Sequence, residues 1–185
     1  LDAGSGDFGA TGAQLDRVRS DGSTVLQVSG AVGTGAWRGL PFPNDTSSPI
    51  DDQLIRVASL SCGTGCGADD VYRLRAWETA ASIPRFNNSS TQVTVVLLQN
   101  AGPTGITGRV YFWNPSGVLV HQEPLALAAH GSVSVNTSAI SALQGQSGTI
   151  TIAHDGPYGI LTGKAVALEP ATGFAFDSML DVRPR

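Results

Sequence analysis

The sequence predicts an all-β protein, an antiparallel β-sandwich architecture arranged as two small β-modules in tandem. Apolar and polar residues alternate with the two-residue period of strands over most of the chain, whereas the period of an amphipathic helix is almost absent. Short alternating runs recur about every 8–12 residues between Gly, Pro, Asn and Ser, as they do in sandwiches and barrels. Helical segments are too few for a parallel α/β sheet.

The strands are expected within two modules. Residues 1–82 form a Gly-rich β-module with long loops at 30–39 and 40–50, and residues 83–185 form an immunoglobulin-like sandwich with a C-terminal tail. The polar segment 80–90 is the expected junction between them. The clearest strand patterns lie at 24–28, 54–57, 71–77, 93–98, 109–113, 132–135 and 149–152.

The run at residues 93–98 is apolar on both faces, which predicts a central strand covered on both sides. The phases chosen for this and the neighbouring strands define a predicted core for the second module. Its members are Val93, Val95, Leu97, Val110, Phe112, Val133, Val135, Ile150, Ile152 and Val166.

Two connections carry local signals. Asn114-Pro115-Ser116-Gly117 has the residue preferences of a type I turn, so residues 109–125 are predicted to form a β-hairpin. Residues 138–143 are the one helical candidate, with Asn136 or Thr137 available to cap the start and Gly145 to end it.

Composition limits the partners that the protein can have. The 185 residues are 41% apolar, which is enough to build a core, but only 14% are charged, well below the globular average of about 25%. The net charge of −4 is opposite to that of a surface for nucleic acid or an anionic membrane, and we expect neither as a partner. No apolar run reaches about 18 residues, so no membrane insertion is expected.

Cys62 and Cys66 are the two cysteines of the chain, and the glycines between them allow a short loop to close. We predict a local disulfide, which indicates an oxidising, extracellular location. The alternatives are metal ligation and redox catalysis. A zinc site requires about four nitrogen or sulfur ligands, and the three histidines lie far from these cysteines in sequence. Thiol-redox sites use C-x-x-C, whereas this spacing is C-x-x-x-C.

The stretch DDVYRLR at residues 69–75 closes a β-rich segment and resembles the final strand of pre-peptidase C-terminal-like modules. The remainder of the chain beyond this strand resembles the immunoglobulin-like or fibronectin-like modules of large bacterial secreted proteins. The resemblance implies a β-sandwich fold, an extracellular location and an accessory or adhesive role. It brings no catalytic motif to carry over.

Catalytic chemistry has little support in the sequence. A G-x-S-x-G nucleophile motif is absent, and we predict no catalytic residues and no enzyme activity. His154 and Asp155 are the most suggestive pair, because Asp155 could orient the imidazole or share a metal ion with it. The favoured interpretation is a strand end before a Gly-Pro turn, in which both side chains cap backbone groups.

Paired carboxylates occur at Asp51-Asp52 and Asp69-Asp70. Adjacent strand residues point to opposite faces, so neither pair forms an acid/base dyad by itself. Calcium is one possible cofactor, since loop carboxylates and carbonyls are the ligands that it prefers. The alternative is that these residues belong to solvated turns, and we name no metal ligands.

The strand at 71–77 carries the candidate binding face. Alternation places Arg73, Arg75 and Trp77 on one face, where a guanidinium can stack on the indole and the pair can receive an acidic partner. The alternative is a solvated face whose arginines pair with nearby carboxylates. Tyr111 and Trp113 share a second aromatic face, for which core packing is favoured.

These observations predict a non-catalytic extracellular binding, adhesion or accessory module of a secreted or cell-surface protein. Its partner is expected to be a protein or carbohydrate at a cell surface, or a further copy of the chain. One alternative is a structural subunit that pairs exposed strands into a filament or surface layer, since charges that would protect sheet edges are scarce. A second is a hydrolase whose site is assembled from distant loops.

Overall fold

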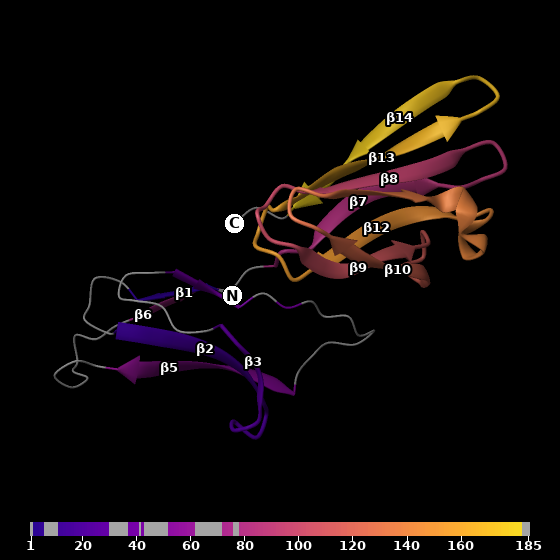
Figure 1. Cartoon of the computed structure of the whole chain (residues 1–185). Helices are drawn as coiled ribbons and strands as arrows, with labels where there is room; N and C mark the ends of the chain where they lie inside the picture. The colour runs from indigo at the N-terminus through magenta and orange to yellow at the C-terminus, as the bar shows by residue number, and fades with distance from the viewer. Residues whose placement is uncertain are drawn as a thin grey trace. The chain divides into compact units, whose positions relative to one another are not determined.

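The computed structural model confirms the all-β fold with antiparallel sheets (Figure 1). It describes residues 2–5, 11–29, 37–40, 42, 52–61, 72–75 and 78–182. The chain divides into two compact units, Leu1–Trp77 and Glu78–Arg185. Among the described residues, no helix is long and apolar enough to cross a membrane.

The first unit contains two small antiparallel sheets. One has the order β3-β2-β5, from β2 (Thr11–Arg19), β3 (Val25–Val28) and β5 (Gln53–Ser61). The other has the order β4-β1-β6, from β1 (Asp2–Ser5), β4 (Trp37–Gly39) and β6 (Tyr72–Arg75). Leu15 and Leu40 are buried together, and Ile55 and Val57 pack against them. Among the described residues of this unit, this apolar cluster is small.

The second unit is a sandwich of two antiparallel sheets. The five-stranded sheet has the order β10-β9-β12-β7-β15 and the four-stranded sheet the order β11-β8-β13-β14. Residues from both sheets form one buried cluster, which includes Phe86 and Phe112. The strands are β7 (Ala81–Asn87), β8 (Val93–Asn100), β9 (Ile106–Trp113), β10 (Leu119–Leu127), β11 (Ser132–Asn136), β12 (Ser147–His154), β13 (Leu161–Glu169), β14 (Phe174–Met179) and β15 (Asp181–Val182).

The expected junction at 80–90 contains β7, a strand of the sandwich core. Ala81, Ile83 and Phe86 are buried in the core, while Pro84 and Arg85 are exposed on the other side. Of the polar residues that suggested a linker, Ser82 and Arg85 are therefore exposed on a core strand, whereas Asn88 after the strand is buried. The C-terminal tail also contains structure, because residues 174–179 and 181–182 form β14 and β15.

The predicted core is correct for the five-stranded sheet and wrong in phase for parts of the four-stranded one. Val110, Phe112, Ile150 and Ile152 are fully buried, and Val133 and Val135 pack against the cluster. In β8 the inner residues are instead Thr94, Val96 and Leu98, and Leu97 is exposed. In β13 they are Ala165 and Ala167 in place of Val166.

The phase of β8 cannot be determined from residue type, because both of its faces are apolar. Small alanines occupy the inner positions of β13, where the two sheets approach, and the larger Val166 and Leu168 point outward. The expectation that both faces of β8 are covered is wrong at Leu97, which is 38% exposed.

The hairpin and the helical candidate formed largely as expected. The carbonyl of Asn114 accepts from the N–H of Gly117 at 2.9 Å, and the Asn114 side chain accepts from the N–H groups of Ser116 and Val118. Gly117 has φ +76°, so β9 and β10 join through a type I turn followed by a left-handed residue. Residues 137–143 form two 3₁₀ turns, with Asn136 capping the first.

Candidate functional site

The predicted binding face lies on β6, whose backbone pairs with β1. In this pairing Arg73 lies opposite Gly4 and Arg75 lies opposite Asp2. Trp77 lies outside the described residues, as do Cys62 and Cys66. The binding face and the disulfide therefore stay predictions. The calcium site also stays a prediction, because Asp51, Asp69 and Asp70 lie outside the described residues, while Asp52 is described and exposed.

His154 is a buried residue at the end of β12, with 1% of its surface exposed. Its Nδ1 accepts a hydrogen bond from the backbone N–H of Gly156 at 3.1 Å. Nε2 is also buried, and the backbone of Thr79 lies close to the ring. Since Nδ1 is the acceptor, the proton of a neutral ring is assigned to Nε2.

Burial lowers the pKa of His154, and this effect exceeds the raising effects of the Asp155 carboxylate and the Thr79 carbonyl. The imidazole is therefore neutral at ordinary pH. Asp155 accepts from the backbone N–H and from the hydroxyl of Thr107, both at 2.7 Å. Both side chains of this pair cap backbone groups near a turn, as the favoured interpretation expected.

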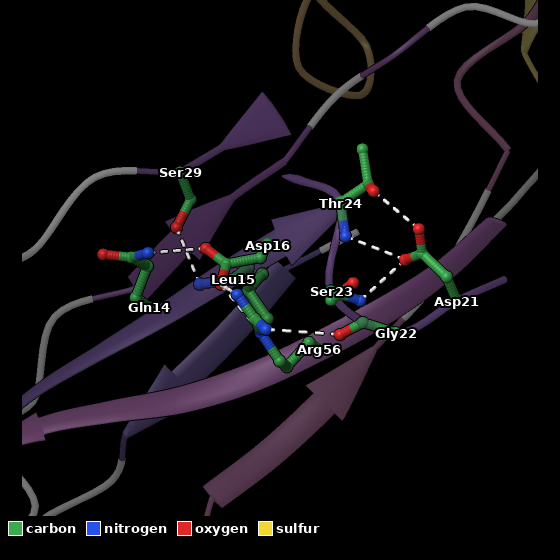
Figure 2. Close-up of polar contacts among 9 residues, drawn as sticks. All are labelled: Gln14, Leu15, Asp16, Asp21, Gly22, Ser23, Thr24, Ser29 and Arg56. Carbon is green, nitrogen blue, oxygen red and sulfur yellow. Dashed lines mark hydrogen bonds and ion pairs between the residues drawn. The ribbon is translucent and has the colours of Figure 1, made fainter. Parts of the chain in front are cut away.

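A second polar cluster, which the sequence did not suggest, surrounds Asp16 in the first unit (Figure 2). Asp16 is 2% exposed, and its Oδ2 accepts from Nε and Nη2 of Arg56 at 3.0 and 2.7 Å. Its Oδ1 accepts from the Gln14 amide at 2.5 Å. Nη1 of Arg56 donates at 3.3 Å to the carbonyl of Gly22, in the turn between β2 and β3.

Opposing effects set the pKa of Asp16. Burial raises it, but the hydrogen bonds from Gln14 and Arg56 and the charge of Arg56 together hold the pKa below its usual value. The neighbouring turn holds an exposed aspartate, Asp21. Its carboxylate accepts from the N–H groups of Ser23 and Thr24 and from the Thr24 hydroxyl, which lowers its pKa. Asp21 therefore stabilises the turn between β2 and β3, while Asp16 joins β2 to β5 through Arg56.

The largest exposed apolar side chains gather on β14, which occupies one edge of the four-stranded sheet. Phe174 is 65% exposed, Phe176 57% and Met179 63%. Phe174 and Phe176 lie opposite Glu169 and Ala167 of β13, and the burial of Ala167 shows that this is the face toward the sandwich core.

The two phenylalanines are exposed because the facing sheet does not extend beneath them. Its last strand, β15, has two residues, pairs with β7 only at Ala81 and Ser82, and comes directly after the Met179 end of β14. Phe174 lies at the opposite end, beside the turn of the β13–β14 hairpin (Figure 1).

The outer face of the same sheet is also apolar beside β14. Leu97 and Met179 flank Lys164 in register, and Leu168 is 41% exposed. The one ion pair of the described β14 residues joins Lys164 Nζ to Asp177 at 2.6 Å. We call Phe174, Phe176, Met179 and Leu168 the β14 surface. The alternation in Phe174-Ala175-Phe176 after a Gly-containing turn could have indicated this strand.

Tyr111 and Trp113 lie on the outer face of β9. Their rings are 6.2 Å apart, and the indole N–H of Trp113 donates to Thr151 at 2.7 Å. Tyr111 is buried, yet neither residue belongs to the sandwich core cluster. Tyr111 and Trp113 therefore pack on the outer side of the five-stranded sheet and not in the expected core between the sheets.

Comparisons with known proteins do not assign a family. No family model matches the chain, and no curated protein matches it. Among solved structures, the VP2 subviral particle of infectious bursal disease virus aligns with 13% identity and a TM-score of 0.24, covering 97% of this chain and 58% of that one. The Gt strain of the same virus aligns with 14% identity and a TM-score of 0.20, covering 97% and 54%. Scores this low carry no argument about fold or function.

Proposed function

We propose that the protein is a non-catalytic binding, adhesion or accessory module of a secreted or cell-surface protein, and that it acts by presenting a surface. The hydrogen bonds of two residues in the second unit support the non-catalytic part of this proposal. His154 and Asp155, the most suggestive catalytic pair, are both committed to groups near a turn. The extracellular location rests on the predicted bond between Cys62 and Cys66.

The β14 surface is the observation that carries the proposal. Isolated exposed apolar residues are common on proteins, but here two phenylalanines on the core-side face and a methionine and a leucine on the outer face place large exposed apolar side chains on both faces of the β14 edge. Aromatic residues and methionine are enriched at protein interfaces. A strand edge also offers backbone donors and acceptors to an extended chain, so the surface favours a polypeptide partner over a carbohydrate.

Replacing Phe174 and Phe176 together by Ser is expected to weaken retention of the protein on the surface or matrix of the producing cells at least about tenfold, as for interface aromatics. Stability should change little, because both side chains are exposed. Val118→Ser is the matched control, an equally exposed apolar residue at the β9–β10 turn. Unchanged retention of the double variant, measured by a sedimentation binding assay, removes the β14 surface from the proposal.

The β6 face gives an independent test of binding in the first unit. Arg73→Gln together with Arg75→Gln is expected to reduce the same retention about tenfold, because bidentate contacts to acidic groups are lost. Arg19→Gln, an exposed arginine of the same unit, is the control. If retention is unchanged, β6 is not a binding face. A large loss of stability in urea unfolding instead identifies these arginines as part of a packed interface.

A structural subunit remains the second candidate function, and one observation favours it. β14 is a sheet edge with exposed aromatic residues and without a described strand beside it on the outer side. Such edges pair readily with other chains.

A further inference from the structure

The second unit has four described sheet edges, and three of them are short or protected. β10 carries Pro124 and an irregular register between Leu119 and His121, both of which discourage pairing. β15 has two residues. β11 has five, and the side chains that it exposes, Ser132, Ser134 and Asn136, are polar. β14 has six residues, pairs with β13 without a register shift, and contains neither proline nor a basic residue. Of these edges, β14 is the least protected against pairing.

The free backbone groups of β14 can be assigned from its pairing with β13. The N–H of Leu180 donates to the carbonyl of Gly163 at 3.1 Å, and these two residues continue the register of the β13–β14 ladder. Because hydrogen-bonded and non-hydrogen-bonded pairs alternate in an antiparallel ladder, Phe174, Phe176 and Ser178 direct their backbone groups toward β13. Ala175, Asp177 and Met179 then direct theirs to the open edge.

We propose that the partner of the β14 surface is a second copy of this chain, joined by antiparallel pairing of the two β14 strands about a two-fold axis at Phe176. This inference rests on the proposed function and names its partner. In this register Phe176 lies opposite the second copy's Phe176, and Ala175 lies opposite the second copy's Asp177. Those two residues carry free backbone groups, so the pairing forms its hydrogen bonds with the groups that β13 leaves open.

Charge selects this register over its neighbour. An axis at Asp177 places two aspartates directly opposite each other, which is unfavourable. An axis at Phe176 separates them, and each Asp177 keeps its Lys164 partner at 2.6 Å. Both phenylalanines of each copy then lie on one continuous face of an eight-stranded sheet, in the space that the facing sheet leaves uncovered beside Phe174.

The area of the β14 surface limits the affinity expected for the dimer. Large aromatic side chains bury about 150–250 Å² each, so the three large exposed apolar side chains of β14, Phe174, Phe176 and Met179, supply less than the roughly 800 Å² per partner of a standard interface. The dimer is therefore expected to be weak and reversible. Pairing about a two-fold axis uses the edge of both copies, so assembly stops at two chains.

Light scattering of the full chain over about two decades of concentration around 10 µM is expected to show a mass rising from 19.0 kDa toward twice that value. Phe176→Lys should hold the protein at the monomer mass, since it places like charges together at the axis. Val118→Lys, matched in exposure at 57%, should behave as the wild type. A constant monomer mass for the wild type overturns the pairing, and species larger than a dimer overturn the two-fold axis.

Cysteine cross-linking tests the register in the same protein. Phe176→Cys should form a bridge between copies under mild oxidation, because non-hydrogen-bonded pairs have Cα atoms about 4.5 Å apart, within disulfide range. Phe174→Cys should not, since the two copies of residue 174 are offset by about 13 Å along the strands. Peptide mapping separates this bridge from any through Cys62 or Cys66.

A bridge at residue 174 overturns the register. If the chain stays monomeric while Phe174→Ser with Phe176→Ser still loses retention, the self-pairing is wrong and the proposed function stands. If the dimer forms and retention is unaffected by that double variant, retention on the producing cells does not use this surface.

Discussion

Replacing Phe112 by Ala is expected to destabilise the second unit by about 3–5 kcal/mol, the usual cost of removing a fully buried phenylalanine. The side chain is 0% exposed, and its ring meets Phe86 edge-on with centroids 5.4 Å apart at 87°. Its ring centroid also lies 6.0 Å from that of His121, on the next strand. The substitution therefore removes contacts that join β7, β9 and β10. Because a domain of ordinary stability has a free energy of unfolding of only about 5–15 kcal/mol, such a loss removes a large part of it.

Hydrogen exchange measured by mass spectrometry can locate this effect, since peptides from β9 and β12 report the second unit without the first. Phe174→Ala is the matched control, because it makes the same chemical change at a side chain that is 65% exposed. We expect the control to change stability by less than about 0.5 kcal/mol. Equal effects of the two variants are incompatible with the burial of Phe112 between the two sheets.

The five-stranded sheet could be predicted from sequence where a strand has one apolar and one polar face. In β12 the residues Ile150 and Ile152 alternate with Thr149 and Thr151, and the predicted phase is correct. The turn at Asn114 is equally local, since its side chain and Gly117 determine the hydrogen bonds. Such signals need no knowledge of the rest of the chain.

The four-stranded sheet could not be predicted as well, because burial there depends on what lies opposite each strand. Val93, Val95 and Leu97 are as apolar as their inner neighbours, and only the position of the facing sheet distinguishes the two sides. For the same reason, the exposure of the β14 surface could not be predicted from the sequence. Phe174 and Phe176 face the core side and are exposed only because the facing sheet ends at β15.

The Asp16 cluster also could not be predicted from the sequence, because its two charged residues are far apart along the chain. Asp16 and Arg56 meet through the register of β2 with β5, in which they lie directly opposite each other. Neither residue stands in a motif. Alternation alone would have assigned Asp16 to a solvated face, whereas it is buried on β2, the central strand of its sheet.

Asp16→Asn is expected to destabilise the first unit by about 2 kcal/mol at neutral pH, within the range for hydrogen bonds to charged groups. Asparagine has nearly the same shape, but it removes the charge that Arg56 neutralises and turns an N–H₂ group toward donor side chains. The cost stays below that of breaking a fully buried pair, because Arg56 is 43% exposed and can bind water instead.

The size of this effect should depend on pH. Because the folded state holds the pKa of Asp16 below the value of about 3.9 for an unfolded chain, the ionised carboxylate stabilises the fold above that value. The contribution is lost as the pH falls through the lower, folded-state pKa. The difference between wild type and Asp16→Asn should therefore be constant above about pH 5 and shrink toward zero in more acidic solution.

The difference in unfolding free energy between wild type and Asp16→Asn can be measured by urea unfolding at a series of pH values. Hydrogen exchange of β2 and β5 peptides then reports the first unit alone. Asp52→Asn, an exposed aspartate of the same unit, is the matched control and should show little difference at any pH. Asp21 titrates identically in wild type and variant, so its contribution cancels. A difference between wild type and Asp16→Asn that stays unchanged from neutral to strongly acidic pH would show that shape, and not charge, is what Asp16 supplies.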